Sequence, residues 1–305
     1  MRYLEKRPMI MIVIGIIGIS LSSILIRYGE APSAVTAAWR LLWTVALMSP
    51  VTLGKARNQQ EIRGMGRKNL MLSILSGLFL SLHFYLWFES LRLTTVASAA
   101  TIVCTEVIWV SLGYWLFMKG RIGLRALIAI GITLAGSVLV ALSDSGEGQG
   151  HLEGDILALL AAIAAGAYTL LGRVVRRDVS TTVYTYVVYG ACAAALTLMA
   201  VIQGDSLAGF GLNPVIVGLA LAVFSTILGH SIFSWCLKFF SPSFVSASKL
   251  CEPVIAAILA SFLFGEIPVW LQVLGAAMIL GGVIWYSRIE NAEANRREKT
   301  GEGKA

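Results

Sequence analysis

The chain has 305 residues, of which 57% are hydrophobic and 13% are charged, and its formal net charge is +7. Soluble domains carry about 25% charged residues, so the composition argues against a separate soluble catalytic domain, a nucleic-acid-binding module and a disulfide-stapled secreted fold. A mean hydropathy of +0.79 indicates instead a membrane protein with most of its residues in the bilayer.

Ten apolar stretches follow one another along the chain, each about as long as a helix that crosses a bilayer. They cover residues 9–27, 34–53, 69–91, 95–118, 124–143, 154–173, 180–203, 213–238, 243–265 and 269–287. Six of the seven prolines lie beside the expected helix ends, where a missing N–H costs least, and only Pro253 lies inside a span. The sequence therefore predicts an all-α polytopic membrane protein with ten transmembrane helices.

Positive charge gathers on one side of the predicted membrane. If the N-terminus lies in the cytoplasm, the inner segments hold 20 of the 24 Lys and Arg residues, within 2–7, 55–68, 119–125, 173–177, 238 and 288–304. The outer loops hold Arg27 and Arg92, and the outer loop from Asp144 to Asp155 is acidic. Cytoplasmic loops are enriched in Lys and Arg, so we expect a multi-pass protein of the plasma or inner membrane with both termini in the cytoplasm. The basic surface then indicates contact with anionic lipids, not nucleic acid.

The two halves of the chain repeat each other weakly. A shift of 146 residues places Glu106 on Glu252, and a one-residue slip places His83 on His230. Each half holds five spans, an odd number, so the second half must start on the opposite side of the membrane. We therefore expect two inverted five-helix repeats, at residues 1–146 and 147–290, and a charged cytoplasmic tail at 291–305 that is disordered. Inverted repeats are typical of secondary transporters, whose substrate sites lie near the bilayer midplane.

Several segments carry a resemblance to a known family. They are Ser81-Leu82-His83-Phe84 with Trp87-Phe88 and "LRLTTVASAA", then "LGHSIFSWCLKFFSPSFVSASKLCEPV" with "FLFGE", "IRYGEAPSAVTAAWRLL" and "LGAAMILGGVIW". Together they resemble the EamA branch of the drug/metabolite transporter superfamily, from about residue 10 to residue 287. The resemblance implies a ten-helix, five-plus-five inverted-repeat carrier with a central cavity, commonly an exporter of amino acids or other small metabolites.

The chain departs from the family pattern at charged positions. Thr105-Glu106-Val107 stands where a Thr-Ser-Pro-like sequence is usual, so a carboxylate replaces the usual proline region. Lys249 stands where an aliphatic residue is usual, and Glu89 where a small one is. These departures make the substrate of other family members a poor guide to the substrate here.

Ionisable side chains at bilayer depth cost at least about 2.5 kcal/mol on insertion scales, so each should face a partner or a wet cavity. The predicted substrate- or ion-binding residues are Glu106, Glu252, Lys249, His83, His230, Arg40 and Trp87. Lys249 and Glu252 share a helix face at i and i+3, and they either line a cavity or neutralise each other. Pro253 is predicted to break the helix, because it cannot donate an N–H to the carbonyl of Lys249.

The other candidates leave alternatives open. Glu106 lies mid-span without an ion partner in its own helix, so it either meets Arg40 or Lys249 from another helix or serves as a proton or cation site. His83 and His230 either titrate and hydrogen-bond a substrate or are packed core residues. Arg40 either snorkels to the outer interface or binds an acidic group.

The sequence thus predicts a secondary-active carrier that works by alternating access, one half rocking against the other, with a small-molecule substrate and a proton as candidate coupling ion. Amino-acid export ranks first, since two carboxylates and a lysine suit a zwitterion; cationic drugs or quaternary amines rank second. An intramembrane enzyme or a channel is the alternative class, but the chain lacks HExxH, GxSxG and GxxxxGK[ST] motifs. No cofactor or metal site is predicted, and the oligomeric state stays open.

Overall fold

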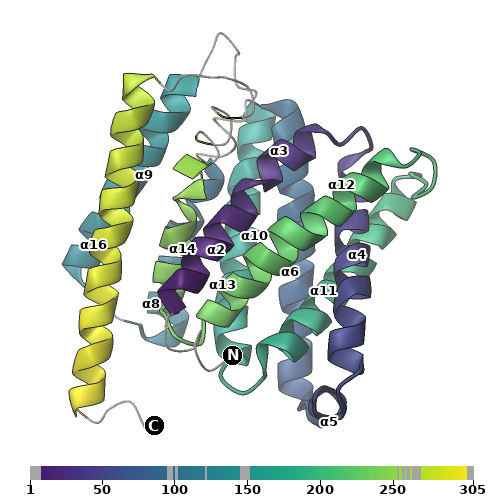
Figure 1. The fold of residues 1–305 in the computed structure, drawn as a ribbon, viewed down its shortest axis with the longest axis horizontal. Coiled ribbons are helices and arrows are strands. Elements are labelled where there is room, and N and C mark those ends of the chain that lie inside the picture. The colour runs from purple at the N-terminus through teal and green to yellow at the C-terminus, as the bar shows by residue number, and fades with distance from the viewer. Residues whose placement is uncertain are drawn as a thin grey trace.

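The computed structural model describes residues 8–94, 99, 102–120, 122–144, 152–252, 254–255, 258, 262 and 269–300. Within these residues every regular element is a helix (Figure 1). The elements are α2 (Pro8–Ser20), α3 (Ser22–Arg27), α4 (Ser33–Leu53), α5 (Ala56–Gly64), α6 (Arg67–Leu93), α8 (Glu106–Met118), α9 (Leu124–Asp144), α10 (Leu152–Val175), α11 (Thr181–Ile202), α12 (Asn213–Leu221), the π-helix η1 (Ala222–His230), α13 (Ser231–Cys236), α14 (Pro242–Lys249) and α16 (Trp270–Thr300).

Seven helical stretches among the described residues are long and apolar enough to cross a membrane. They are Pro8–Ile26, Ser33–Leu53, Arg67–Leu93, Leu152–Val175, Thr181–Ile202, Asn213–Cys236 and Trp270–Glu290. α8 and α9 are apolar and belong to two further predicted spans, and α14 begins the span at 243–265, most of whose second half lies outside the described residues. The predicted all-helical, multi-pass membrane fold is confirmed.

Small side chains allow the central helices to pack closely. α10 buries Ala158, Ala161, Ala165 and Gly166 on one face and packs along α6 through much of its length. On the outside of the bundle apolar side chains are exposed, as Phe117 is with 83% of its surface accessible. Interfaces between membrane helices are rich in small residues, while the outer surface contacts lipid tails, so this distribution matches a protein embedded in a bilayer.

The helices pack in pairs that follow the predicted repeat (Figure 1). The fifth and tenth spans contact each other as α9 and α16, the second and seventh as α4 and α11, and the fourth and ninth as α8 and α14. α2 of the first span packs on η1 of the eighth, and α10 of the sixth packs on α6 of the third. Moving every partner by five spans leaves this set of contacts unchanged, as expected for duplicated halves. The helices of the two halves are interleaved rather than separated.

Four predicted spans are interrupted, which the apolar pattern does not indicate. Span 9–27 is divided at Leu21, and span 95–118 contains a turn at Thr105. Span 213–238 passes through the π-helix η1, and span 243–265 contains a turn at Leu250–Cys251. Hydroxyl groups contribute to the interruptions, because Thr105 Oγ1 donates to the carbonyl of Ile102 at 2.6 Å and competes with regular helical bonding.

The last helix is longer than the predicted span. α16 continues beyond residue 287 and reaches Thr300, so residues 291–300 of the expected disordered tail are helical. The segment "RIENAEANRREKT" holds Glu, Ala, Arg and Lys, which are strong helix formers, and it contains no glycine or proline. A tail rich in charge can therefore extend the transmembrane helix into water.

Candidate functional site

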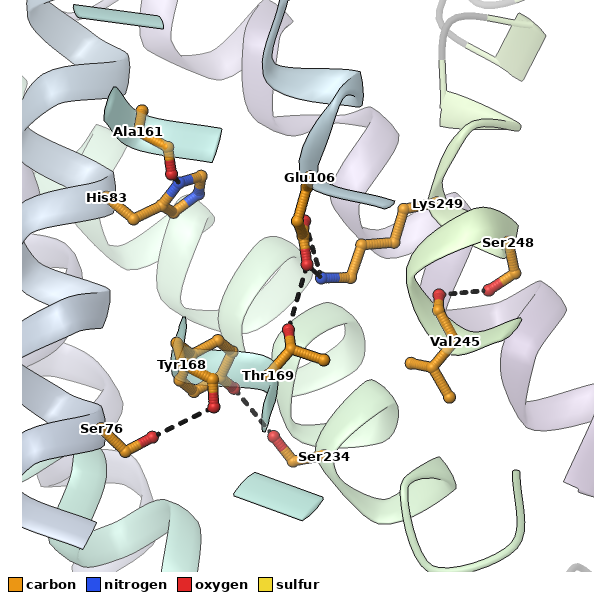
Figure 2. Close-up of polar contacts among 10 residues, drawn as sticks. All are labelled: Ser76, His83, Glu106, Ala161, Tyr168, Thr169, Ser234, Val245, Ser248 and Lys249. Carbon is orange, nitrogen blue, oxygen red and sulfur yellow. Dashed lines mark hydrogen bonds and ion pairs between the residues drawn. The ribbon is translucent and has the colours of Figure 1, made fainter. Parts of the chain in front are cut away.

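An ion pair between the two halves lies inside the bundle. Lys249 Nζ is 2.8 Å from Glu106 Oε1 and 3.1 Å from Glu106 Oε2, and Thr169 Oγ1 of α10 donates to Glu106 Oε1 at 3.0 Å (Figure 2). The two charged side chains are 14% and 8% exposed. Of the alternatives for Glu106, the structure therefore has the contact with Lys249. Glu106 and Lys249, the two charged residues that depart from the family pattern here, form an ion pair with each other.

Helix ends explain why these charges lie where they do. Glu106 is the first residue of α8 and Lys249 is the last residue of α14. A carboxylate is favourable at the positive end of a helix dipole and an ammonium at the negative end. The breaks also correspond between the halves, since Thr105 and Cys251 are 146 residues apart, the shift that aligns the repeats. Discontinuous helices at the midplane are a common source of substrate and ion sites in transporters.

Glu252 follows the second break as Glu106 follows the first, but its surroundings differ. It is partly buried, and its side chain forms no ion pair within 4 Å among the described residues. Its backbone carbonyl accepts from Ser20 Oγ at 3.4 Å, which connects the break in span 9–27 to the break in span 243–265. Of the two alternatives for Lys249 and Glu252, the structure does not have the mutual ion pair: Lys249 pairs with Glu106, and the turn at Leu250–Cys251 interrupts the regular helix between Lys249 and Glu252.

The two predicted histidines meet. The rings of His83 on α6 and His230 at the end of η1 have centroids 6.4 Å apart. His83 Nδ1 lies 3.0 Å from the carbonyl oxygen of Ala161, whereas His230 Nδ1 is buried and has no hydrogen-bond partner among the residues that the structure describes. The Phe84 ring meets His230 edge-on at 5.1 Å, and the Tyr168 ring lies 6.1 Å from His230. Repeat-related residues thus form one aromatic and polar cluster.

Arg40 neither snorkels to the surface nor binds an acidic side chain among the described residues. It is 1% exposed, and its Nε donates to Thr226 Oγ1 of η1 at 2.7 Å. Its guanidinium carbon lies 4.0 Å from the centroid of the Phe84 ring, a cation–π geometry. The packing of α4 against α12 and η1 covers Arg40 with protein, so its side chain cannot reach the interface.

The remaining predictions have different outcomes. Trp87 is 7% exposed and packs in the hydrophobic core that contains Phe84 and Tyr184. Pro253, the predicted helix break, lies outside the described residues, although the turn just before it is described. Among the described residues no group of three or more His, Cys, Asp or Glu could hold a metal ion.

Sequence reasoning missed the hydroxyl groups that organise the site. Thr169 and Thr226 hold Glu106 and Arg40, and neither has a pattern in the sequence that distinguishes it from other threonines in apolar helices. Tyrosines found in spans pair with serines from other helices. The pairs are Tyr168 with Ser234 at 2.8 Å, Tyr184 with Ser76 at 2.7 Å, Tyr189 with Ser231 at 3.0 Å and Tyr186 with Ser49 at 3.0 Å. The tyrosines inside the predicted spans could be identified from the sequence, but the serines that they hydrogen-bond could not.

Comparison with known proteins agrees with this architecture. Proteins described as uncharacterized transporters are similar: one from Clostridium kluyveri is 25% identical over 212 residues, 68% of each chain. YxxF of Bacillus subtilis is 23% identical over 251 residues, covering 81% of this chain and 80% of its own. A protein of known crystal structure shares the fold with a TM-score of 0.77 over 94% of this chain and 98% of that chain, at 19% identity.

The model of the EamA-like transporter family matches the chain twice, at residues 6–142 and 152–288. Two matches of one family model imply duplicated halves, in agreement with the symmetric packing of the helices. The chain therefore belongs to the EamA-like transporter family and is a membrane transporter, not an enzyme.

Proposed function

We propose that this transporter is a secondary-active carrier that works by alternating access and exports amino acids or related small zwitterions. The observation that carries the proposal is the buried Glu106–Lys249 pair, which joins α8 of the first repeat to α14 of the second. A buried ion pair across moving elements can form in one state and separate in another, and ion pairs at interfaces commonly rearrange in such transitions.

We infer which groups of helices move together from the interleaved packing of the two repeats. α4 of the first repeat packs on α11 and α12 of the second, and α9 of the first packs on α16 of the second. We infer that the two sequence halves do not move as separate bodies. We infer that each body combines helices from both repeats, and that the breaks at Thr105 and Leu250–Cys251 allow segments of α8 and α14 to shift between them.

Unpaired charge supports a zwitterionic substrate. Lys249 neutralises Glu106, and this leaves Glu252 as a partly buried carboxylate without an ion pair among the described residues. A carboxylate in that position can bind the ammonium group of an amino acid, or a proton that couples transport to a gradient. The aromatic rings of Phe84, Tyr168 and Phe233 also favour a second candidate, a cationic drug or quaternary amine held by cation–π contact.

Orientation follows from charge. The positive excess lies at the end of the bundle that holds α5 and the last residues of α10, the lower end in Figure 1. Membrane proteins keep such loops in the cytoplasm, and we propose that this end faces the cytoplasm of the cell that exports the substrate.

Counterflow in proteoliposomes tests the proposal. Purified protein is reconstituted with unlabelled substrate inside, and uptake of labelled amino acids, nucleosides and quaternary amines is measured with empty liposomes as control. Saturable exchange of amino acids supports the proposal, and exchange restricted to quaternary amines supports the second candidate. Absence of exchange by folded protein across the panel contradicts the carrier function proposed here.

The same assay tests proton coupling. Exchange by the wild-type protein should depend on pH, and Glu252→Gln should abolish that dependence because the amide cannot titrate. Flux that is independent of pH in both proteins would exclude Glu252 as the coupling site.

A further inference from the structure

Arg40 is a buried cation that the protein itself does not neutralise. Its side chain is 1% exposed, yet no carboxylate lies within 4 Å of it among the described residues. Its Nε donates to Thr226, its guanidinium faces the Phe84 ring, and its Nη2 has no hydrogen-bond partner in the part of the chain that the structure describes. A buried charge is costly unless it is paired and hydrogen-bonded, so a guanidinium in this state has an unused capacity for an anion.

A second buried arginine shows that the fold can satisfy such a group where its role is structural. Arg176, just after α10, is 4% exposed; its Nε donates to the carbonyl of Ser234 and its Nη1 to the carbonyl of Val179. Burial lowers the pKa of Arg176 to about 10, so the side chain stays protonated at neutral pH. Arg40 has one hydroxyl acceptor where Arg176 has carbonyls from two segments of the chain.

An independent observation points to the same place. Among the described residues His230 Nδ1 is also buried without a hydrogen-bond partner. The His230 ring packs at 87° against the Phe84 ring, whose centroid lies 4.0 Å from the Arg40 guanidinium carbon. Both Thr226 and His230 belong to the π-helix η1. π-Helical turns occur frequently at functional sites. Here one turn carries both the Thr226 hydroxyl that accepts from Arg40 and the His230 Nδ1 atom that lacks a partner among the described residues.

The cluster is continuous with the ion pair. Tyr168 contacts His230, and Thr169, the next residue of α10, donates to Glu106 (Figure 2). Glu252 belongs to the same electrostatic neighbourhood, because its charge interacts with those of Lys249, Glu106 and Arg40. Arg40 and Glu252, neither of which forms an ion pair among the described residues, thus accompany the neutralised Glu106–Lys249 pair.

We propose that Arg40 binds the carboxylate of the transported substrate, with His230 as a second polar contact, while Glu252 binds its ammonium group. This inference rests on the proposed carrier function and specifies its substrate as a molecule with a free carboxylate. Arg40 lies on α4 and its acceptor Thr226 on the π-helix η1, so a local shift of η1 away from α4 exposes the guanidinium. Arginine suits the role, since its planar fork binds carboxylates through two hydrogen bonds.

Competition during counterflow tests the inference. The labelled amino acid that the wild-type protein exchanges fastest is challenged with three unlabelled competitors: the same amino acid, its carboxamide and its N-acetyl derivative. The carboxamide keeps the ammonium group and lacks the negative charge, and the N-acetyl form keeps the carboxylate and lacks the positive charge. Wild-type protein should prefer the free amino acid over each derivative by about tenfold to a hundredfold, the usual effect of a hydrogen bond to a charged group.

Variants assign each preference to a residue. Arg40→Gln should lose the preference over the carboxamide, Arg40→Lys should keep part of it, and Glu252→Gln should lose the preference over the N-acetyl form. Arg176→Gln is the matched control: it removes a buried arginine that donates to the backbone carbonyls of Ser234 and Val179, and it should leave both preferences unchanged. Folding of each variant is checked by size-exclusion chromatography.

The outcomes separate this inference from the carrier function. An Arg40→Gln protein that exchanges amino acids with the wild-type preference overturns the role of Arg40 and leaves the carrier function intact. If Arg40→Gln does not fold, the wild-type competition decides alone: equal competition by amino acid and carboxamide overturns the inference. Absence of all exchange by the wild-type protein contradicts the carrier function itself.

Discussion

Glu106 and Glu252 occupy equivalent positions in the two repeats, and the structure treats them differently. Each follows a break in its helix, 146 residues apart. Glu106 is 6% exposed and is held by Lys249 and Thr169, whereas Glu252 forms no ion pair among the described residues. Duplication supplied two carboxylates at equivalent positions, and the neighbours that each acquired left Glu106 paired with Lys249 and Glu252 without an ion pair among the described residues.

Of the substitutions that test this difference between Glu106 and Glu252, Lys249→Met should have the largest effect on the free energy of unfolding. It leaves Glu106 buried without its counter-charge, and removal of one partner of a buried ion pair costs about 3–5 kcal/mol. We expect the free energy of unfolding in detergent to fall by that amount. The double variant Glu106→Gln with Lys249→Met should recover most of the loss, because no unpaired charge remains. A loss in the double variant equal to the sum of the losses in Glu106→Gln and Lys249→Met would show that the pair contributes no coupling energy.

Equivalent glycines test whether the repeats are equally packed elsewhere. A Cβ on Gly136 of α9 would lie 2.7 Å from the carbonyl oxygen of Gly275, and a Cβ on Gly282 of α16 would collide with Thr133 Oγ1. Alanine at either position should destabilise the α9–α16 contact by about 1–3 kcal/mol, the usual cost of overpacking. Gly281→Ala is the control, since a Cβ there meets nothing within 4 Å. Thermal unfolding should rank the three variants, and equal behaviour of Gly281 and Gly282 would contradict the packing.

Thr169→Val sharpens the comparison by removing one neutral contact of Glu106. The hydroxyl donates to a charged acceptor that is also held by Lys249, so we expect a loss of about 1.5 kcal/mol in the free energy of unfolding. The residue volume is nearly unchanged, and Thr182→Val, at a less buried threonine on α11, provides a comparison. A loss no greater than in the control would indicate that Lys249 alone holds Glu106.

Glu252→Gln should have the smallest effect on stability and a large one on transport. Without an ion pair to break, the substitution should not lower the free energy of unfolding, because it removes an unpaired charge from a partly buried position. Amino-acid exchange in proteoliposomes should fall at least about tenfold, because the proposed ammonium contact is lost. A strongly destabilised variant with normal exchange would reverse the roles assigned to the two glutamates.

Much of the fold could be predicted because the bilayer imposes simple rules. Backbone groups in hydrocarbon must bond internally, so ten apolar stretches had to be helices. The residues of the candidate site were also visible, since ionisable side chains in apolar helices are few. Their partners were not decided: the spacing of Lys249 and Glu252 fitted either a cavity-lining face or a pair within one helix, and Glu106 had Arg40 and Lys249 as alternative partners. In the structure Lys249 pairs with Glu106 across the two repeats.

Sequence alone determined the helical membrane class, the duplication and the short set of buried charges, because hydropathy and charge are local properties of the chain. The tertiary structure decided which charges meet. Contacts between Arg40 and Thr226, or Glu106 and Lys249, join residues 186 and 143 positions apart, and they depend on how broken helices from two repeats interleave. A local sequence pattern does not predict contacts between residues so far apart in the chain. The difference between the paired Glu106 and Glu252, which has no ion pair among the described residues, therefore becomes visible only in the tertiary structure.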